Sequence, residues 1–286
     1  MTTPNLRLVL DSGTFVCAPG IQDMITALVC NKVGFDFIYS PGYWSTASAH
    51  GLPDAGIASY TQMLERLETL SKISNAGIIA DADTGYGGLL NVHHTVRGFE
   101  AAGAVGIQIE DQEFPKKCGH TRNKRVVPLE DMVTKIKVAC EARKNLDTLI
   151  IARTDAKQPE SYEAAIERGQ AYSEAGADVI FVEALETEDE MRDACNRIKV
   201  PMMANMADGG KTPILPNAVL KNIGYAMSIF PAMTSLAAAA AAESSLRNLK
   251  ENGTSIASEI RLFNFSEFNE LIGFPEIWDF EKKWSR

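Results

Sequence analysis

Short apolar segments of this 286-residue chain repeatedly end in acidic side chains, which are the first candidates for chemistry. Asp81 and Asp83 occur in DADTGYGG, Glu110 closes VGIQIED, and Asp54 lies in GLPDAG. Converging carboxylates repel one another unless a cation or a substrate compensates. Oxygen ligands without clustered histidine or cysteine suit Mg2+ or Mn2+. Alternate residues of an extended strand share a face, so we expect Asp81 and Asp83 to reach one ion directly or through water.

Polar residues also close the neighbouring apolar segments. Taken singly, a carboxylate after a strand is more often a helix cap or a surface group, so the argument depends on the whole set. In a barrel of parallel strands the carboxyl ends meet at one mouth, where the chemistry takes place. Besides the acids above, the residues read from these ends are Tyr39, Ser40, Asp111, Arg153, Asp155, Glu183 and Asn205.

Cys118 differs from the other four cysteines because it lies in KKCGH, a polar loop that follows IEDQ. The neighbouring Lys116 and Lys117 would stabilise a thiolate and lower the thiol pKa toward the working range. A cysteine in such surroundings can exchange a proton with a carbon or oxygen centre. The alternative is an incidental cysteine in a surface loop, but the nearby acids favour the catalytic interpretation. The odd cysteine count, without CxxC spacing, argues against disulfides and structural zinc.

Candidate strands and helices alternate along the whole chain. The apolar segments lack strict alternation, which is typical of parallel strands buried on both faces. Eight strand–helix units predict an α/β fold, a (β/α)8 TIM barrel, with a doubly wound open sheet as the alternative. The expected strands span residues 15–18, 35–40, 77–83, 105–111, 149–155, 178–184, 201–206 and 225–230. The expected helices span residues 21–33, 59–74, 91–103, 128–143, 161–176, 187–198 and 216–223.

We expect one domain over residues 1–286, because no Gly-Ser linker or change of composition interrupts the chain. Residues 250–286 form an aromatic-rich helical tail that we expect to pack against another surface. A net charge of -9 without a long basic run argues against a nucleic-acid partner. No stretch approaches the roughly 20 apolar residues of a membrane span, and the N-terminus lacks signal-peptide features. We therefore expect a cytoplasmic protein without a membrane partner.

Four motifs in this order, GLPD, DADTGYG, IEDQ with KKCGH, and ARTDA, resemble the isocitrate lyase and phosphoenolpyruvate mutase superfamily. The resemblance covers about residues 10–245. It is nearest to the short carbon–carbon lyase branch of 2-methylisocitrate lyase, dimethylmalate lyase and oxaloacetate acetylhydrolase. It implies a barrel whose last helix is swapped between neighbours in a homotetramer, a dimer of dimers. It also implies Mg2+, which Mn2+ can replace, a small di- or tricarboxylate substrate, and a gating loop over residues 112–126.

The same resemblance implies residue roles, position by position. Cys118 would move a proton at carbon, Arg153 would grip the substrate, and Tyr39 is a candidate base. The catalytic positions would be Cys118, Tyr39, Lys116, His120 and Arg153. The acids that hold the metal, mostly through water, would be Asp54, Asp81, Asp83 and Glu110. The substrate-binding positions would be Pro41, Gly42, Tyr43, Gly119, Arg153, Glu183 and Asn205.

Two departures from the family pattern bear on the substrate. Relatives keep small residues, often Ser-Gly-Gly, where this chain has Pro41, Gly42, Tyr43 and Trp44. A substrate carboxylate would then be held by the Gly42 and Tyr43 amides in a narrower, more aromatic pocket. Methylisocitrate lyases carry an arginine where this chain has Leu236, so a third carboxylate would lack a partner. Both departures favour a smaller or more apolar dicarboxylate.

The sequence leaves several functions open. The first is a Mg2+-dependent lyase on a substituted malate-like 2-hydroxy or 2-oxo acid, by retro-aldol or Claisen chemistry with Cys118 as proton donor. The others are hydrolysis of oxaloacetate to oxalate and acetate, and cleavage of 2-methylisocitrate. A phosphonate mutase or hydrolase is disfavoured because such relatives usually lack the cysteine of KKCGH. The complete acid set disfavours a non-catalytic protein.

Overall fold

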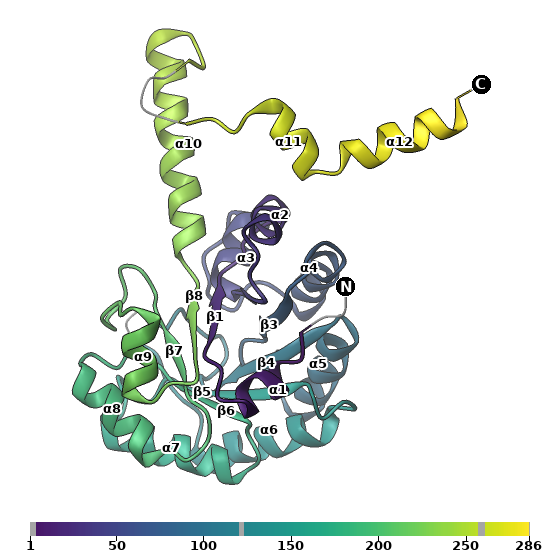
Figure 1. Ribbon diagram of the computed structural model, residues 1–286. Coiled ribbons are helices and arrows are strands. Elements are labelled where there is room, and N and C mark those ends of the chain that lie inside the picture. The colour runs from purple at the N-terminus through teal and green to yellow at the C-terminus, as the bar shows by residue number, and fades with distance from the viewer. Residues whose placement is uncertain (1–3, 120–122, 257–260, 286) are drawn as a thin grey trace.

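The computed structural model describes residues 4–119, 123–256 and 261–285 of the chain. Within these residues, eight parallel strands form the wall of a barrel, and helices cover its outside (Figure 1). The strands are β1 (Val16–Pro19), β2 (Phe37–Ser40), β3 (Gly77–Asp81), β4 (Ala104–Glu110), β5 (Leu149–Thr154), β6 (Val179–Val182), β7 (Met203–Asn205) and β8 (Met227–Phe230). Each overlaps a segment in which the sequence predicted a strand.

Backbone pairing closes the barrel. Strands β2 to β6 form one parallel sheet in chain order, and β1, β8 and β7 form a second one. Two single bridges join the sheets, Gly20 with Tyr39 and Ile180 with Met202. Next to the first bridge, the Ile21 N–H donates to the Tyr39 carbonyl at 2.9 Å. The strands thus follow one another around the wall, which confirms the barrel and excludes the open sheet.

The strands are buried on both faces, as their apolar sequences predicted. Ile78 and Ile150 belong to the large cluster between strands and helices. The residues that follow them, Ile79 and Ile151, belong to a second cluster inside the barrel. Leu6, from the short helix α1 (Leu6–Asp11), is part of this interior cluster. The barrel interior is therefore a packed core, and polar chemistry is confined to its mouth.

The outer helices begin at residues that suit helix starts. Ser59 and Gln62 form a capping box at the start of one helix, and Thr187 accepts from the Glu190 N–H at 3.1 Å at another. All the helices that the sequence predicted between strands are present. They are α2 (Met24–Val33), α4 (Tyr60–Ile73), α5 (Leu89–Ala101), α6 (Leu129–Ala142), α7 (Tyr162–Glu174), α8 (Glu188–Arg197) and α9 (Asn217–Ile223).

One helix at the barrel mouth was not predicted. Helix α3 (Gly42–His50) follows β2 directly, in a segment that begins with the dipeptide Pro41-Gly42. Both residue types usually mark turns, so the local sequence gives no signal for a helix that starts there. In the structure Pro41 is the N-cap, with a φ of -79°, and its restricted φ is compatible with a helix start. The first turn of α3 consequently lies beside the acids that follow β3.

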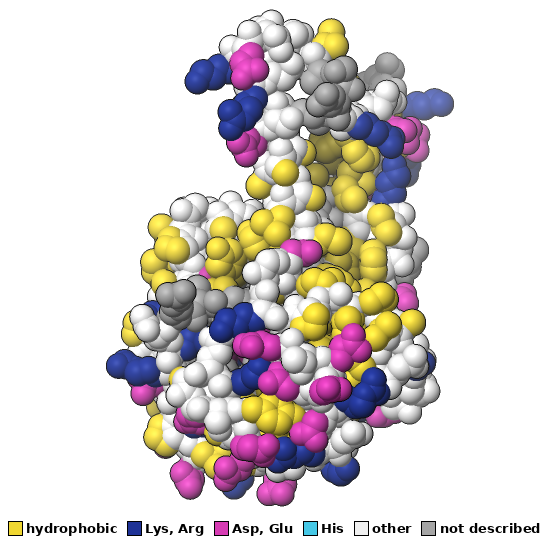
Figure 2. Space-filling model, turned by 90° about the vertical axis from the view of Figure 1, so that its left-hand side faces the viewer, with side chains coloured by type: hydrophobic (Ala, Val, Ile, Leu, Met, Phe, Trp, Pro, Cys, Tyr) yellow, Lys and Arg dark blue, Asp and Glu magenta, His cyan; other side chains and the backbone are white. Residues whose placement is uncertain are grey.

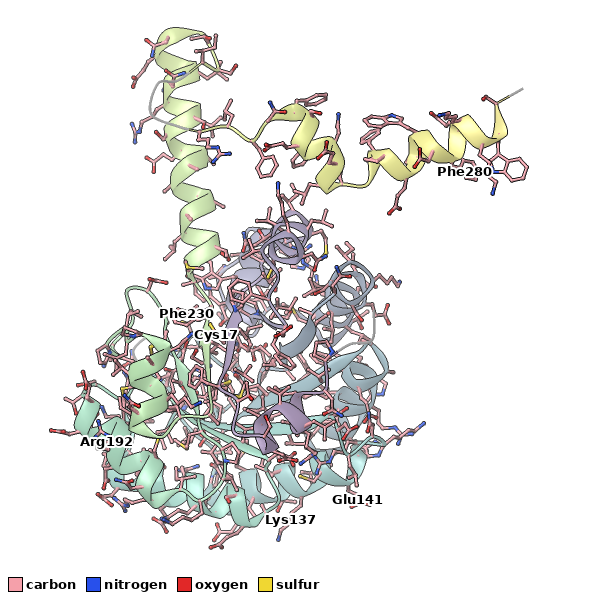
Figure 3. The ribbon with its side chains drawn as sticks, in the orientation of Figure 1. Cys17, Lys137, Glu141, Arg192, Phe230 and Phe280 are labelled. Atoms are coloured by element: carbon pink, nitrogen blue, oxygen red, sulfur yellow. The ribbon has the colours of Figure 1, made fainter. Side chains whose placement is uncertain are left out.

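Three C-terminal helices extend away from the barrel (Figure 1). They are α10 (Met233–Asn252), α11 (Phe265–Leu271) and α12 (Phe274–Trp284), and none has a buried residue. This arm starts at Met233, earlier than the expected residue 250. Phe280 is exposed on its far end (Figure 3), and hydrophobic side chains also gather on the barrel where the arm departs (Figure 2). Exchange of the arm between neighbours stays a prediction. Among the described residues, no helix is long and apolar enough to cross a membrane.

Candidate active site

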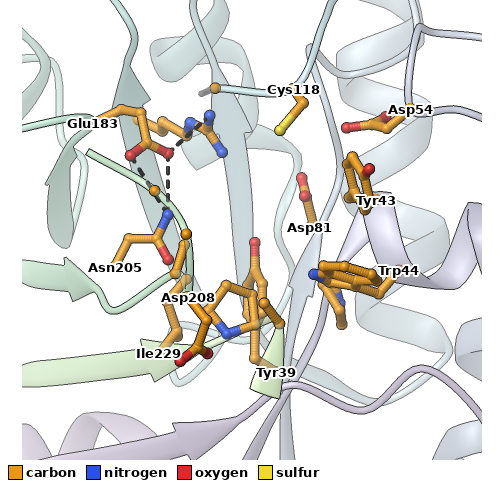
Figure 4. Close-up of a pocket in the computed structure, with 18 of the residues that line it drawn as sticks. Tyr39, Tyr43, Trp44, Asp54, Asp81, Cys118, Glu183, Asn205, Asp208 and Ile229 are labelled. Carbon is orange, nitrogen blue, oxygen red and sulfur yellow. Dashed lines mark hydrogen bonds and ion pairs between the residues drawn. The ribbon is translucent and has the colours of Figure 1, made fainter. Parts of the chain in front are cut away.

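A cavity of about 300 Å³ opens at the carboxyl ends of the strands (Figure 4). It brings together most of the residues that the sequence singled out, although they are spread over more than 160 positions of the chain. Of these, the cavity is lined by Tyr39, Pro41, Tyr43, Asp54, Asp81, Lys116, Cys118, Gly119, Arg153, Glu183 and Asn205. Gly42, Asp83 and Glu110 lie directly behind this lining, in contact with it. His120 lies outside the described residues.

Asp81 is the centre of the acid cluster. One of its carboxylate oxygens, Oδ1, accepts from the Asp83 N–H at 3.0 Å and from Gln108 Nε2 at 3.3 Å, and the other accepts from the Gly42 N–H at 3.1 Å. The expectation that Asp81 and Asp83 share a strand face is wrong, because β3 ends at Asp81 and Asp83 has a φ of 49°. A turn, not strand alternation, brings the two acids together.

The Lys116 ammonium lies between two of the acids. Its Nζ is 2.7 Å from both oxygens of Asp54 and 2.7 Å from Oδ1 of Asp83, and all three side chains are nearly buried. Burial alone would lower the pKa of Lys116, but Asp83, Glu110, Asp54 and Asp81 together raise it well above its usual range. Three of these carboxylate oxygens lie within 2.7 Å of the ammonium, and the expected effect of Lys116 on the Cys118 thiol stays a prediction.

Two acids of this cluster are poorly compensated. Burial, opposed by Lys116 and reinforced by Asp81 and Asp54, raises the pKa of Asp83 to about 7. Burial raises the pKa of Glu110 well above its usual range, despite Arg153 and Lys116. Glu110 Oε1 is also buried without a hydrogen-bond partner among the described residues. A buried carboxylate oxygen of this kind calls for a cation or a water molecule.

The acid set fits a hydrated cation better than a directly coordinated one. The part of the chain that the structure describes holds no group of three or more acidic, histidine or cysteine side chains arranged as direct ligands. Mg2+ binds oxygen atoms and usually keeps several of its water molecules, so it needs few direct protein ligands. The uncompensated Glu110 oxygen beside Asp81 and Asp83 suits such an ion. Asp54, Asp81, Asp83 and Glu110 are thus compatible with water-mediated metal binding.

Arg153 is a buried permanent cation in the lining of the cavity, next to Glu110. Its Nε lies 2.9 Å from Asp155 Oδ2 and 3.4 Å from Glu110 Oε2, and Nη2 lies 3.0 Å from Glu183 Oε2. Burial would lower the pKa of Arg153, but Asp155, Glu110 and Glu183 raise it well above its usual range. Asn205 donates to Glu183 Oε2 at 3.1 Å (Figure 4). The guanidinium is thereby held in one orientation toward the cavity.

Tyr39 is held as a hydrogen-bond donor at the cavity floor. Its hydroxyl donates to Gln108 Oε1 at 3.1 Å. Burial and the Asp81 carboxylate raise the pKa of Tyr39 well above its usual range. A neutral phenol orients a substrate oxygen but accepts a proton poorly, so this environment disfavours Tyr39 as the base.

The first turn of α3 and the start of α10 form the apolar side of the cavity. The Gly42 N–H is bonded to Asp81, so the expectation that this amide holds the substrate carboxylate is not met in this arrangement. The ring centroids of Tyr43 and Trp44, two residues of the cavity lining, lie 4.6 Å apart. The apolar residues of this wall are Trp44, Ala207, Ile229, Pro231, Ala232 and Leu236. Asp208 is the acidic residue at its edge (Figure 4).

Cys118 and Gly119 close the cavity from above. The Cys118 thiol points toward Asp81 and Tyr39 (Figure 4). A methyl group on Gly119 would lie 2.1 Å from Arg153 Nη2 and 2.8 Å from Glu183 Oε2. The segment can therefore rest on the ion pair only because residue 119 has no side chain.

Gly119→Ala is expected to lower kcat/KM by about a hundredfold, because either Arg153 or the Cys118 segment must shift by about 1 Å. Steady-state kinetics on the true substrate measure this loss. Gly88→Ala is the matched control, since a methyl group there meets no atom within 4 Å. Equal activity of the two variants would contradict the close packing of Gly119 on Arg153.

Sequence reasoning missed two polar residues that organise the site. Gln108 joins Tyr39 to Asp81, and it is visible in the sequence as a polar residue inside the apolar strand VGIQIED. Lys124 is buried against Asp155. Its segment RNKR resembles an ordinary solvated charge run, so no signal in the sequence distinguished it.

Comparison with known proteins assigns the family. The sequence pattern of the family described as "Phosphoenolpyruvate phosphomutase" matches residues 6–250. The chain belongs to this family. A 2,3-dimethylmalate lyase of Eubacterium barkeri is 42% identical over 284 residues, which cover 99% of this phosphomutase-family chain and 98% of that protein. A 2-methylisocitrate lyase of Aeropyrum pernix is 41% identical over 278 residues, covering 97% of this chain and 88% of that protein.

Solved structures agree with this assignment. A 2,3-dimethylmalate lyase, described as a member of the PEP mutase/isocitrate lyase superfamily, superposes with a TM-score of 0.92 at 34% identity, over 100% of this chain and 96% of that one. An oxaloacetate acetylhydrolase in complex with 3,3-difluorooxalacetate superposes with a TM-score of 0.92 at 29% identity, over 98% of this chain and 96% of that one. A phosphonopyruvate hydrolase in complex with oxalate and Mg2+ superposes with a TM-score of 0.88 at 30% identity, over 99% of this chain and 98% of that one. The predicted membership of this enzyme superfamily is confirmed.

Proposed function

We propose that this phosphomutase-family enzyme is a Mg2+-dependent carbon–carbon lyase that cleaves a substituted malate-like dicarboxylic acid. The observation that carries the proposal is the composition of one cavity. A thiol, Cys118, and a buried guanidinium, Arg153, line this cavity together with Asp54, Asp81 and an apolar wall, and Glu110 behind the lining has a raised pKa. Relatives named 2,3-dimethylmalate lyase and 2-methylisocitrate lyase support carbon–carbon cleavage.

The protein groups divide the work of cleavage between them. Arg153 binds a substrate carboxylate or the oxygen that gains charge, and Tyr39 donates a hydrogen bond to the same region. When the substrate hydroxyl gives its proton to water at the cavity mouth, its oxygen forms a carbonyl, and the electron pair of the broken carbon–carbon bond passes to the departing carbon, which becomes an enolate-like carboxylate. The released proton balances the one that later returns to the thiolate. The Cys118 S–H gives its proton to that carbon, and the thiolate is reprotonated before the next turnover.

The metal would be held near Asp54, Asp81, Asp83 and Glu110, mostly through water. When bound, Mg2+ supplies positive charge that stabilises a developing alkoxide or enolate oxygen. A solved neighbour, phosphonopyruvate hydrolase, is described in complex with oxalate and Mg2+, which supports Mg2+ as the cofactor here, with Mn2+ as a substitute.

The apolar wall sets the substrate class that we propose. Trp44 and Leu236 line the cavity, and Asp208 adds a negative charge at its edge. By the resemblance to methylisocitrate lyases, Leu236 stands where a third carboxylate would find an arginine. A buried carboxylate without a partner is costly, whereas methyl groups pack well against such a wall. A methylated malate therefore fits better than 2-methylisocitrate or isocitrate.

A substrate panel tests both the activity and the selectivity. We expect kcat/KM to be highest for a four- to six-carbon dicarboxylate such as 2,3-dimethylmalate, and poor for 2-methylisocitrate. The double variant Trp44→Gly, Leu236→Arg is expected to improve 2-methylisocitrate cleavage at least about tenfold, the scale of one new charge-assisted contact. Leu146→Arg, an exposed leucine outside the cavity, is the control. If the wild type cleaves 2-methylisocitrate best, the selectivity argument is wrong, and Trp44 and Leu236 have only a packing role.

Oxaloacetate acetylhydrolase activity is the second candidate. The similarity to a solved oxaloacetate acetylhydrolase favours it, and the same cavity can hold an unsubstituted four-carbon acid. The panel separates the two functions by product. Release of oxalate and acetate from oxaloacetate, faster than cleavage of any 2-hydroxy acid, would replace the lyase proposal with this one.

We also propose that the enzyme is a homotetramer that exchanges its C-terminal arm. The exposed apolar residues of α10 to α12, including Leu246, Trp278 and Phe280, support a second copy as the surface that covers them. Light scattering coupled to gel filtration is expected to give about four times the 31.2 kDa of one chain. A monomer mass would contradict the exchange.

A further inference from the structure

Lys124 is a fully buried charge that the proposed chemistry does not use. Its side chain is 1% exposed, although lysine is rarely buried without a specific partner. The residue lies outside the cavity lining. Removing an ammonium group from water is costly, so its partners indicate what its burial achieves.

The Lys124 ammonium joins two parts of the active site. It donates to Asp155 Oδ1 at 2.8 Å and to the carbonyl oxygen of Gly119. Asp155 Oδ2, on the same carboxylate, accepts from Arg153 Nε at 2.9 Å. Gly119 directly follows Cys118. One ammonium thus connects the backbone that carries the thiol to the carboxylate that orients the guanidinium.

The carboxylate that Lys124 contacts is rigidly held by the barrel. The Asp155 N–H donates to Asp111 Oδ1 at 2.8 Å. The other oxygen of Asp111 accepts from Thr154 at 2.7 Å and from Tyr172 at 2.8 Å. Asp155 therefore offers a fixed anchor to which Lys124 ties the carbonyl of Gly119.

Charge explains why a second cation is needed at this anchor. Arg153 contacts three carboxylates, those of Asp155, Glu110 and Glu183, and is a single positive charge. Without Lys124, the buried Asp155 would be balanced by Arg153 alone and would draw the guanidinium toward itself. Lys124 shares this carboxylate, so Arg153 keeps its contacts with Glu110 and Glu183.

We propose that Lys124 is a positioning residue, which fixes the Cys118–Gly119 backbone and the Arg153 guanidinium relative to each other through Asp155. Gly119 packs against Arg153 without room for a side chain, so this relative placement is tight. The kinetic consequence rests on the proposed lyase function. The structural consequence, a fixed position of the half-buried Cys118 thiol, does not.

The test compares Lys124→Met with Arg125→Met. Arg125 is the adjacent cation, exposed and paired with Glu113 at 2.6 Å, so its loss controls for charge removal in the same segment. Iodoacetamide labelling of Cys118, followed by peptide mass spectrometry, reports the position of the thiol without any substrate. Cys140, outside the cavity on α6, is the internal reference. Kinetics on the best substrate of the panel give kcat and KM separately.

We expect Lys124→Met to label at Cys118 about tenfold faster or more than Arg125→Met, because a buried charge pair that held the segment is gone. Cys140 labelling should be unchanged, and kcat should fall more than KM rises. The double variant Lys124→Met, Asp155→Asn should be labelled at Cys118 about as fast as the faster single variant. The reason is that each substitution breaks the same Lys124–Asp155 contact.

Equal Cys118 labelling in Lys124→Met and Arg125→Met would overturn the proposal, and so would faster labelling of Cys140 to the same degree, which reports general loosening. If Lys124→Met does not fold, Lys124→Gln, which has a donor but no charge, is judged by the same criteria. Because labelling needs no turnover, a protein inactive on every acid of the panel still tests Lys124, while its inactivity counts against the lyase proposal alone.

Discussion

Cys118→Ser is expected to lower kcat about a hundredfold or more, the scale of a lost acid–base group, without loss of fold or metal binding. A serine hydroxyl occupies nearly the same space but gives up its proton far less readily than a thiol. The Cys118 side chain faces the cavity between Asp81, Tyr39 and the guanidinium side of the site, where the reacting carbon would lie (Figure 4).

Steady-state kinetics and thermal unfolding measure this result together. Cys140→Ser is the matched control, because that cysteine, on α6, donates to the Gly176 carbonyl at 3.2 Å and is not part of the cavity lining. It should keep wild-type kcat. Near-wild-type turnover by Cys118→Ser on the true substrate would remove the thiol from the mechanism and leave its proton transfer to another group.

Removal of divalent cations is expected to abolish turnover, and Mg2+ or Mn2+, but not Zn2+, should restore it. The reason is the all-oxygen acid set at Asp54, Asp81, Asp83 and Glu110, of which Glu110 Oε1 has no hydrogen-bond partner among the described residues. Full activity after exhaustive treatment with EDTA would contradict a role for the metal.

The same acids give a second measurement that needs no substrate. The raised pKa of Asp83, about 7, means that the metal-free folded state binds a proton there more tightly than the unfolded chain does. The stability of the metal-free protein should therefore fall as the pH rises from about 4, the usual aspartate pKa, toward about 7. Mg2+ held near Asp83 would compensate the carboxylate in place of that proton, so the increase in Tm on adding Mg2+ should be larger at about pH 8 than at about pH 5.5. Glu110→Gln should reduce the difference between the Mg2+-induced increases in Tm at the two pH values. A larger Mg2+-induced increase in Tm at about pH 5.5 than at about pH 8 would contradict the assignment of these acids to the metal site.

Much of the fold could be predicted because it depends on local and periodic features. The eight apolar segments and the helices between them reflect burial on both faces, a property that each segment carries in its own composition. Helix α3 was missed because Pro41-Gly42 has the local signature of a turn, and only the packing after β2 makes it a helix start. The point at which the arm leaves the barrel, Met233, was likewise not encoded locally, because an Ala-rich helix gives no indication of which surface it covers.

The sequence by itself determined which residue types meet at the barrel mouth, because parallel strands in chain order bring all their carboxyl ends together. Asp81, Arg153 and Glu183 followed from that rule, whereas Asp54, in the loop GLPDAG, was placed at the site by the resemblance to the family. Only the tertiary structure decided which charges compensate one another. It paired Lys116 with Asp54 and Asp83, and it buried Lys124 against Asp155. Such choices depend on distances of a few ångströms between distant segments and on exclusion of water, neither of which a sequence pattern contains.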